Sequence, residues 1–226
     1  MSVQNLLEQL LQSGVSKYEG AKQSGDLGKY ATGAAVGGAL ALLLGSKRGR
    51  NFGGKALKVG TVAALGTLAW RAYNDWQARQ QAGSPASAAG APQAARPALP
   101  SFEALPAPQL EDHSRAMLKA LIAAAKADGH LDDRERGVVE AELQRLDADP
   151  ATRRWVEDEL RRPVEPADVA AASTGPQMAA EIYLASVIVA DDTTTMERAY
   201  LDELARQLKL PAELKADLEA RAKAGG

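Results

Sequence analysis

The chain of 226 residues contains no cysteine. This absence excludes disulfides, thiolate metal sites and cysteine-based redox chemistry. Two histidines, His113 and His130, offer little material for a histidine-rich zinc site. Aromatic residues make up 4% of the chain, whereas alanine, leucine and charged residues dominate it. This balance favours helices over sheets, so we expect an all-α protein.

Charge is divided unevenly between the two halves of the chain. Residues 1–109 carry 11 Lys and Arg against 5 Asp and Glu, a net charge of +6, and residues 110–226 carry 16 against 24, a net charge of −8. The basic, apolar front half suits an anionic membrane surface. The acidic back half is a poor match for nucleic acid, because phosphate binding needs clustered Lys and Arg. We therefore expect no nucleic-acid partner.

The first residues predict a short amphipathic helix. Val3, Leu6, Leu7, Leu10 and Leu11 share the spacing of one helix face. Because about three turns are marginal alone in water, we expect this helix to dock on another surface. That surface is either its own chain, or a membrane or a partner protein.

An uncharged run of seventeen residues, 30–46, is the clearest membrane signal. It reaches the lower limit of the roughly 17–25 residues that cross a bilayer as a helix. Small residues recur in it at every fourth position, at Gly33, Gly37, Ala41 and Gly45. Such a stripe lets helices approach closely in lipid, so we expect it to support a homo-oligomer.

A basic patch and a shorter apolar run, Val59–Trp70, come next. Twelve residues are short for a second crossing, so we favour one crossing, with Trp70, Tyr73 and Trp76 in the interface. The membrane contact is thus expected through residues 30–70. With one crossing, the positive-inside rule then predicts that the C-terminal domain is cytoplasmic.

Composition divides the chain into four regions. We expect an amphipathic start at 1–29, a glycine-rich membrane-associated helical segment at 30–76, a Pro/Ala-rich linker at 77–109 and an acidic helical domain at 110–226. The linker assignment rests on residues 82–109, which hold six of the eleven prolines and show no periodicity.

Prolines mark the helix starts of the acidic domain, since proline is well tolerated at the first helical position. Such prolines stand at positions 150, 166, 176 and 211. We predict helices near 150–161, 166–173, 176–190, 195–208 and 211–223, and two more before residue 150. The expected architecture is a bundle of about seven short helices.

One pattern occurs twice in this domain. Residues 121–128, LIAAAKAD, align with residues 184–191, LASVIVAD, at an offset of 63, and Glu135-Arg136 then matches Glu197-Arg198 at an offset of 62. Each copy is an apolar helix, an Ala-Asp end, a polar turn and a Glu-Arg helix start. We call the two turns, residues 128–135 and 191–197, the two corners.

The carboxylates of the corners have two interpretations. Asp132 with Glu135, and Thr194 with Glu197, have the spacing of capping boxes, which satisfy free backbone N–H groups without any ligand. Capping does not explain Asp128 and Asp191, which end helices and so face the negative ends of the helix dipoles. The alternative is an oxygen-rich site for Ca²⁺ or Mg²⁺, formed if the corners meet. Its candidate ligands are Asp128, Asp132, Glu135, Asp191, Asp192 and Glu197.

At these residues the chain resembles the TerB-like domains, a helical family named from tellurite-resistance operons. The Ala-Asp-Gly-x-hydrophobic turn is present at residues 127–131, followed by Glu135. The whole arrangement is similar to YebE-like bacterial inner-membrane proteins, with a leucine-rich start, a glycine-rich segment and an ending like ERAYLDELARQLKL. The resemblance implies a bacterial inner-membrane protein with an acidic, metal-associated helical module of membrane-linked stress complexes, without an established reaction.

Three functions follow from these features. The first is a non-enzymatic membrane-tethered module that binds a divalent cation, an unknown partner protein, or both, in an envelope or stress-response context. The second is a self-associating membrane scaffold without a ligand site. The third is a metal-dependent hydrolase, in which the same carboxylates would hold an ion that activates water.

Overall fold

The computed structural model describes residues 2–9, 62–82, 106–127, 147–190 and 194–224, with positions 137, 139, 140, 143 and 144 between them. The secondary structure of these residues is helical, without a strand, which confirms the predicted all-α class. An N-terminal helix spans residues 3–9. The further helices are α4 (Val62–Ala82), α5 (Ala107–Ala125), α7 (Pro150–Arg161), α8 (Pro166–Ala170), α9 (Pro176–Val189), α10 (Thr195–Gln207) and α11 (Ala212–Ala224).

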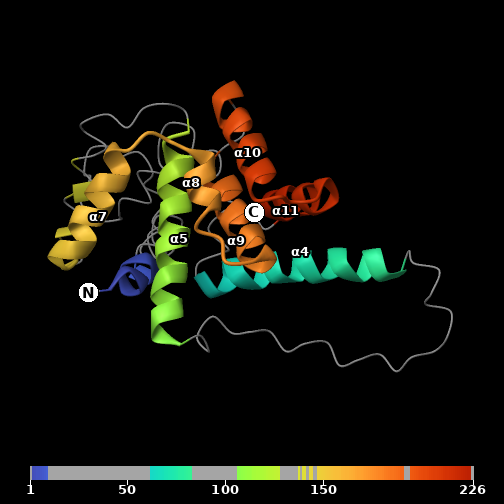
Figure 1. Ribbon diagram of the computed structural model, residues 1–226, viewed down its shortest axis with the longest axis horizontal. Helices are drawn as coiled ribbons and strands as arrows, with labels where there is room; N and C mark the ends of the chain where they lie inside the picture. The colour runs from blue at the N-terminus through green and yellow to red at the C-terminus, as the bar shows by residue number, and fades with distance from the viewer. Residues whose placement is uncertain are drawn as a thin grey trace, which may run out of the picture.

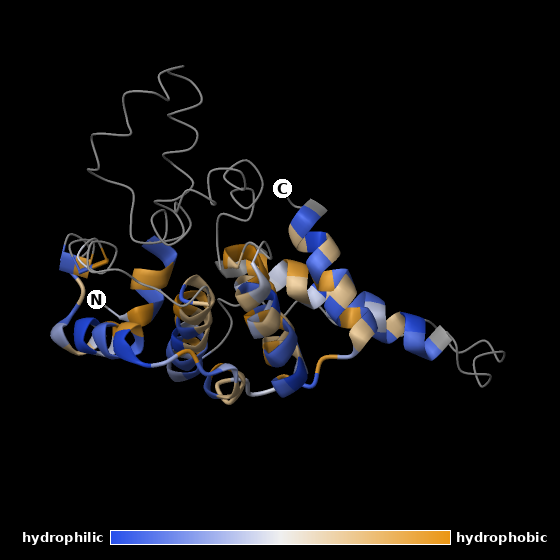
Figure 2. Cartoon of the chain, turned by 90° about the horizontal axis from the view of Figure 1, so that it is seen from above, coloured by the Kyte–Doolittle hydropathy of each residue, from blue (hydrophilic) through white to orange (hydrophobic). Residues whose placement is uncertain are grey.

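Helix α9 is the centre of the bundle. Nine of its fourteen residues are buried, from Met178 to Val187. A helix that is apolar on all sides must be surrounded, and α9 packs against α4, α5, α10 and α11. The apolar colours accordingly lie toward the middle of the molecule in Figure 2, and hydrophilic residues dominate its two ends.

The N-terminal helix packs on its own chain, beside α5 (Figure 1). Val3 and Leu6 are 0% exposed, and Leu7 is 1% exposed. Burying a side chain of this size stabilises a fold by about 1.5–3 kcal/mol. The first of the two docking surfaces left open by the sequence is therefore the one observed.

Helix α4 corrects the membrane prediction. Among the helices of the described residues, none combines the length and the apolar character that a membrane crossing needs. This finding contradicts the predicted transmembrane helix and the predicted bacterial inner-membrane location with a cytoplasmic C-terminal domain. The glycine-spaced stripe of Gly33, Gly37, Ala41 and Gly45 lies outside the described residues, so the predicted self-association through it stays a prediction.

The physical reason for the correction is the way α4 is used. Its apolar stripe of Leu65, Ala69 and Ala72 is buried in the same core as α5 and α9. Tyr73 and Trp76, expected at a membrane interface, pack against that core instead. Trp70 is half-buried on the same helix.

The polar side of α4 pairs with α11. Asp75 lies 2.7 Å from Arg221, and Arg79 lies 3.4 Å from Asp217. Because ascending positions on α4 meet descending positions on α11, the two helices are antiparallel. Exposed ion pairs such as these each contribute about 0–1 kcal/mol to stability. Their main effect is therefore on the orientation of α4 against α11, and the buried apolar stripe supplies most of the stability.

Helix α7 begins with a side-chain cap that was not predicted. Asp149 Oδ1 accepts hydrogen bonds from the backbone N–H groups of Ala151 and Thr152 at 2.9 and 3.0 Å. The Thr152 hydroxyl donates to the other carboxylate oxygen at 2.7 Å. The bonds from Thr152 are the main cause that lowers the pKa of Asp149 from 3.8 to about 2. The ionised cap is thus a stabilising contact.

We expect the packing of α4 to show in a matched pair of charge insertions. Ala72→Glu places a carboxylate at a 0% exposed position and should lower the free energy of unfolding by more than about 3 kcal/mol. Ala78→Glu adds the same charge at an exposed position of α4 and should change it by less than about 0.5 kcal/mol. Urea unfolding measures both, and equal effects would show that α4 does not pack on the bundle.

We also expect Asp149 to contribute stability that depends on pH. Because its folded pKa is depressed, the contribution is full above the unfolded value near 4 and is lost as pH falls toward about 2. Asp149→Ala should cost about 1 kcal/mol at neutral pH, whereas Asp149→Asn keeps a capping oxygen that does not titrate. In urea unfolding at pH 6 and pH 3, the advantage of the wild type over Asp149→Asn should shrink at pH 3. A constant advantage would contradict the assignment.

Candidate functional site

The two copies of the repeated pattern end two helices that pack directly on each other, α5 and α9. Leu121 and Leu184, which open the copies, are 3% and 0% exposed. Ala127 and Ala190, which precede the two corners, are 7% and 2% exposed. Both apolar stretches therefore belong to the core, and each corner starts at the end of a buried helix.

Lys126 fixes the end of α5. Its Nζ donates to the backbone carbonyl of Glu159 at 3.0 Å and to that of Arg162, both at the end of α7. A cation at this position satisfies carbonyls that have no helical partner and opposes the negative end of the α7 dipole. The small hollow beneath it has a volume of about 20 Å³, room for about one water molecule. Lys126 thus has a structural role, which is to join the end of α5 to the end of α7.

The second corner leads into the predicted capping box. The backbone N–H and the hydroxyl of Thr194 donate to Glu197 Oε2 at 2.9 and 2.8 Å. The backbone N–H of Glu197 donates in return to Thr194 Oγ1 at 3.1 Å. This reciprocal pair confirms the box, and it holds a carboxylate that is 7% exposed. Whether Glu197 also binds a metal stays a prediction.

The other predicted ligands lie outside the described residues. They are Asp128, Asp132, Glu135, Asp191 and Asp192. The predicted capping box of the first corner lies there too. In the part of the chain that the structure describes, no group of three or more histidine or carboxylate side chains is arranged to hold a metal ion.

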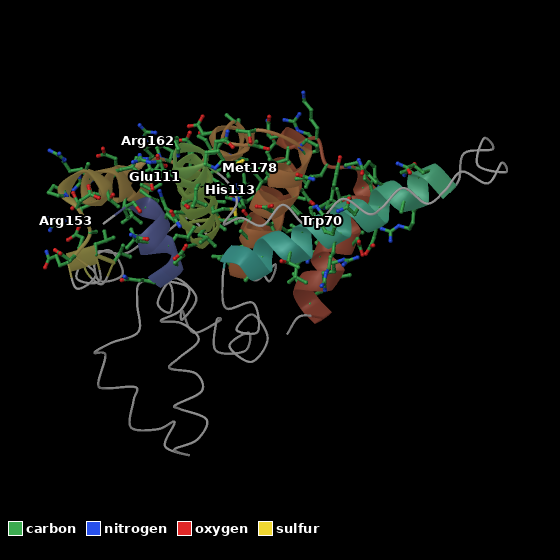
Figure 3. The ribbon with its side chains drawn as sticks, turned by 90° about the horizontal axis from the view of Figure 1, so that it is seen from below. Trp70, Glu111, His113, Arg153, Arg162 and Met178 are labelled. Atoms are coloured by element: carbon green, nitrogen blue, oxygen red, sulfur yellow. The ribbon has the colours of Figure 1, made fainter. Side chains whose placement is uncertain are left out.

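A side-chain contact that the sequence did not indicate joins α5 to α9. His113 Nε2 lies 2.7 Å from Glu181 Oε2, with the two side chains 12% and 14% exposed. Gly66 of α4 is close by, since a Cβ there would lie 3.7 Å from Glu181 Oε1. The pair therefore ties the two repeat-bearing helices together where a third helix crosses them, and Figure 3 shows His113 between them.

A second polar network joins the N-terminal helix to α5 and α7. Glu111 accepts from the backbone N–H of Val3 at 3.2 Å and of Gln4 at 3.4 Å, one with each carboxylate oxygen. Arg115 lies 3.4 Å from Glu111, and its guanidinium lies 5.6 Å from the centre of the Trp155 ring. This distance is within reach of a cation–π contact. One carboxylate thus caps a helix that begins 108 residues earlier.

The hydroxyl of Tyr200 is buried beneath α10. Burial raises the pKa of this group to about 12, because the charged form would lose its hydration. The tyrosine therefore stays neutral at physiological pH.

A shallow recess of about 250 Å³ lies against the outside of α7. Its wall combines Arg153 and Arg154 with Glu140 and Glu157. Small-molecule sites are usually larger and mostly apolar. The recess has the mixed charge of an ordinary protein surface.

Comparisons with known proteins place the chain among uncharacterised relatives. The family profile described as "Protein of unknown function (DUF533)" matches residues 29–222. An "uncharacterized protein in ampR 5' region" from Yersinia enterocolitica is 28% identical over 110 residues, which cover 49% of this chain and 79% of the relative. No solved structure matches the chain.

We expect the His113–Glu181 pair to couple α5 and α9 energetically. In a double-mutant cycle of His113→Ala and Glu181→Ala, the interaction energy should be about 1–3 kcal/mol, because each single change leaves the other polar group without its partner in a nearly dry place. Thermal or urea unfolding of the four chains measures it.

The matched control is a cycle of His113→Ala with Glu213→Ala. Glu213 is exposed and accepts from Gln80 on α4 at 2.9 Å. These two changes should add to within about 0.5 kcal/mol. An interaction energy this small in the His113–Glu181 cycle would show that the two side chains are close but do not stabilise the fold through their contact.

Proposed function

We propose a function from one premise: the chain belongs to the DUF533 family, a TerB-like family of unknown function. In this proposal the protein is a non-enzymatic helical module that binds a divalent cation, and through it a partner protein, at the two corners. The YebE-like group is the branch we propose for it, on the leucine-rich start and the ERAYLDELARQLKL ending.

The observation that carries the proposal is the direct packing of α5 on α9. The two helices that lead into the corners are neighbours, and the His113–Glu181 contact joins them. Lys126 anchors the end of α5, and the capping box anchors the start of α10. Binding constellations need such rigid supports, because a ligand set that must be ordered on binding loses affinity.

The chemistry of the corners favours a hard cation. Their candidate ligands are carboxylates, the ligands that Ca²⁺ and Mg²⁺ prefer. Glu197 is committed to its cap, and capping accounts for neither Asp128 nor Asp191. We propose that these two hold the ion, with Asp132, Glu135 and Asp192 as neighbours that contribute oxygen atoms or negative potential.

Isothermal titration calorimetry of the full chain tests the cation. Ca²⁺ or Mg²⁺ should give saturable heat in the wild type and none in the double variant Asp128→Asn with Asp191→Asn, because two ligand charges are removed. The control is Asp112→Asn with Asp158→Asn, which removes the same charge from exposed positions of α5 and α7 and should bind as the wild type does.

Two outcomes would reject the proposal. Absence of heat with every divalent cation tested on the folded wild type would remove the cation. Equal loss of binding in both double variants would show that binding depends on the net charge of the chain and not on the corner residues, since the control changes the total charge by the same amount. Circular dichroism of each variant confirms that the bundle is intact.

A further inference from the structure

The N-terminal helix lies outside the segment that the family profile matches. The family match begins at residue 29, whereas the helix spans residues 3–9. Residues 10–61 separate it from α4 along the chain. It nevertheless fills the core, with Val3, Leu6 and Leu7 at most 1% exposed. The bundle therefore has a site that receives a short helix from a distant part of the sequence.

This site recognises the beginning of an amphipathic helix. Glu111 accepts hydrogen bonds from the backbone N–H groups of Val3 and Gln4, one with each carboxylate oxygen. These N–H groups are free only at the start of a helix, so the site receives a helix N-terminus. Three apolar side chains at positions i, i+3 and i+4 then enter the core. The side chains of Glu111 and Arg115 are 29% and 41% exposed, so the polar edge of the site is open to water. These requirements define a helix-in-groove site.

The helix is short and depends on the bundle for its stability. It has about two turns, which is too short to be stable alone in water. Its cap comes largely from α5, with a longer bond of 3.4 Å from Asn5 N–H to the hydroxyl of Ser2. Such an element leaves and returns as a unit more easily than a helix that is packed along several turns, such as α5 or α9.

We propose that this groove accepts residues 3–9 of a second copy of the chain. The one sequence known to fit the groove is present in every copy, and an exchanged helix would make the same contacts as the resident one. Fifty-two residues, 10–61, could reach roughly 170 Å when fully extended, so their length permits a helix to reach a neighbouring bundle. The proposal is independent of the cation at the corners, since it uses none of their residues.

A peptide of residues 1–11 tests the groove on the full chain. The host is the variant Leu6→Asp with Leu7→Asp, whose own helix can no longer fill the core. A fluorescein-labelled peptide should bind this host at least about tenfold more tightly than the wild type, because the tethered resident helix competes at a high effective concentration. The control peptide carries the same two aspartates and should not bind. Equal affinity for both hosts would overturn the proposal.

Two further measurements keep the proposal testable if that variant fails to fold. In hydrogen exchange of the wild type, residues 3–9 should open without α5; a single joint opening of both would overturn exchange of the helix. In light scattering, the wild type should form dimers as its concentration rises, and a strict monomer up to the millimolar range would exclude the second copy as occupant. Both are made without added divalent cations, so a failed calorimetric titration does not decide them.

Discussion

The burial of α9 is the constraint on which the rest of the structure depends. A fourteen-residue helix with apolar side chains on every side is stable only when other helices cover all of it. The chain meets this need with α5 on one side and with α4, α10 and α11 on the others. The hydroxyl of Tyr183, a buried residue of α9, donates to Glu219 of α11 at 2.6 Å. The positions of the outer helices thus follow from the need to enclose α9.

Polar contacts then fix where the helices begin and end. Asp149 and Thr194 cap helix starts from within their own segments, whereas Glu111 and Lys126 satisfy the ends of helices that are remote in sequence. Each contact pairs backbone groups that a helix end leaves without a partner. The corners are thereby attached to well-defined elements, which is the property that a recognition surface needs. In the same way, Glu111 of α5 satisfies the first backbone N–H groups of the N-terminal helix.

Local patterns predicted the helices of the acidic domain closely. Pro150, Pro166 and Pro176 each begin a helix, and α11 starts one residue after Pro211. The capping box at Thr194 was also predictable, because its two side chains are three residues apart. The pair of His113 with Glu181 was not, since the residues are 68 positions apart and no periodicity relates them. For the corner carboxylates other than Glu197, the described residues leave the prediction as it was.

The membrane prediction failed for a reason that is physical. An apolar stripe of small residues is equally suited to lipid and to the side of another helix, so the sequence near residues 59–70 could not distinguish the two environments. Leu65, Ala69 and Ala72 are buried against the bundle, and Asp75 and Arg79 pair with α11. The same ambiguity applied to the N-terminal helix, of which Leu6 and Leu7 face their own chain.

By itself, the sequence determined the helical class, the helix starts at the prolines, the repeat and the cap of α10. These depend on residues a few positions apart, whose interactions are set by the geometry of a helix turn. Tertiary structure alone decided which apolar faces meet, that α4 and residues 3–9 share the core of the acidic domain, and that Glu111, Lys126 and Glu181 find partners on other helices. Those outcomes depend on contacts between distant segments, which the spacing of residues along the chain does not encode.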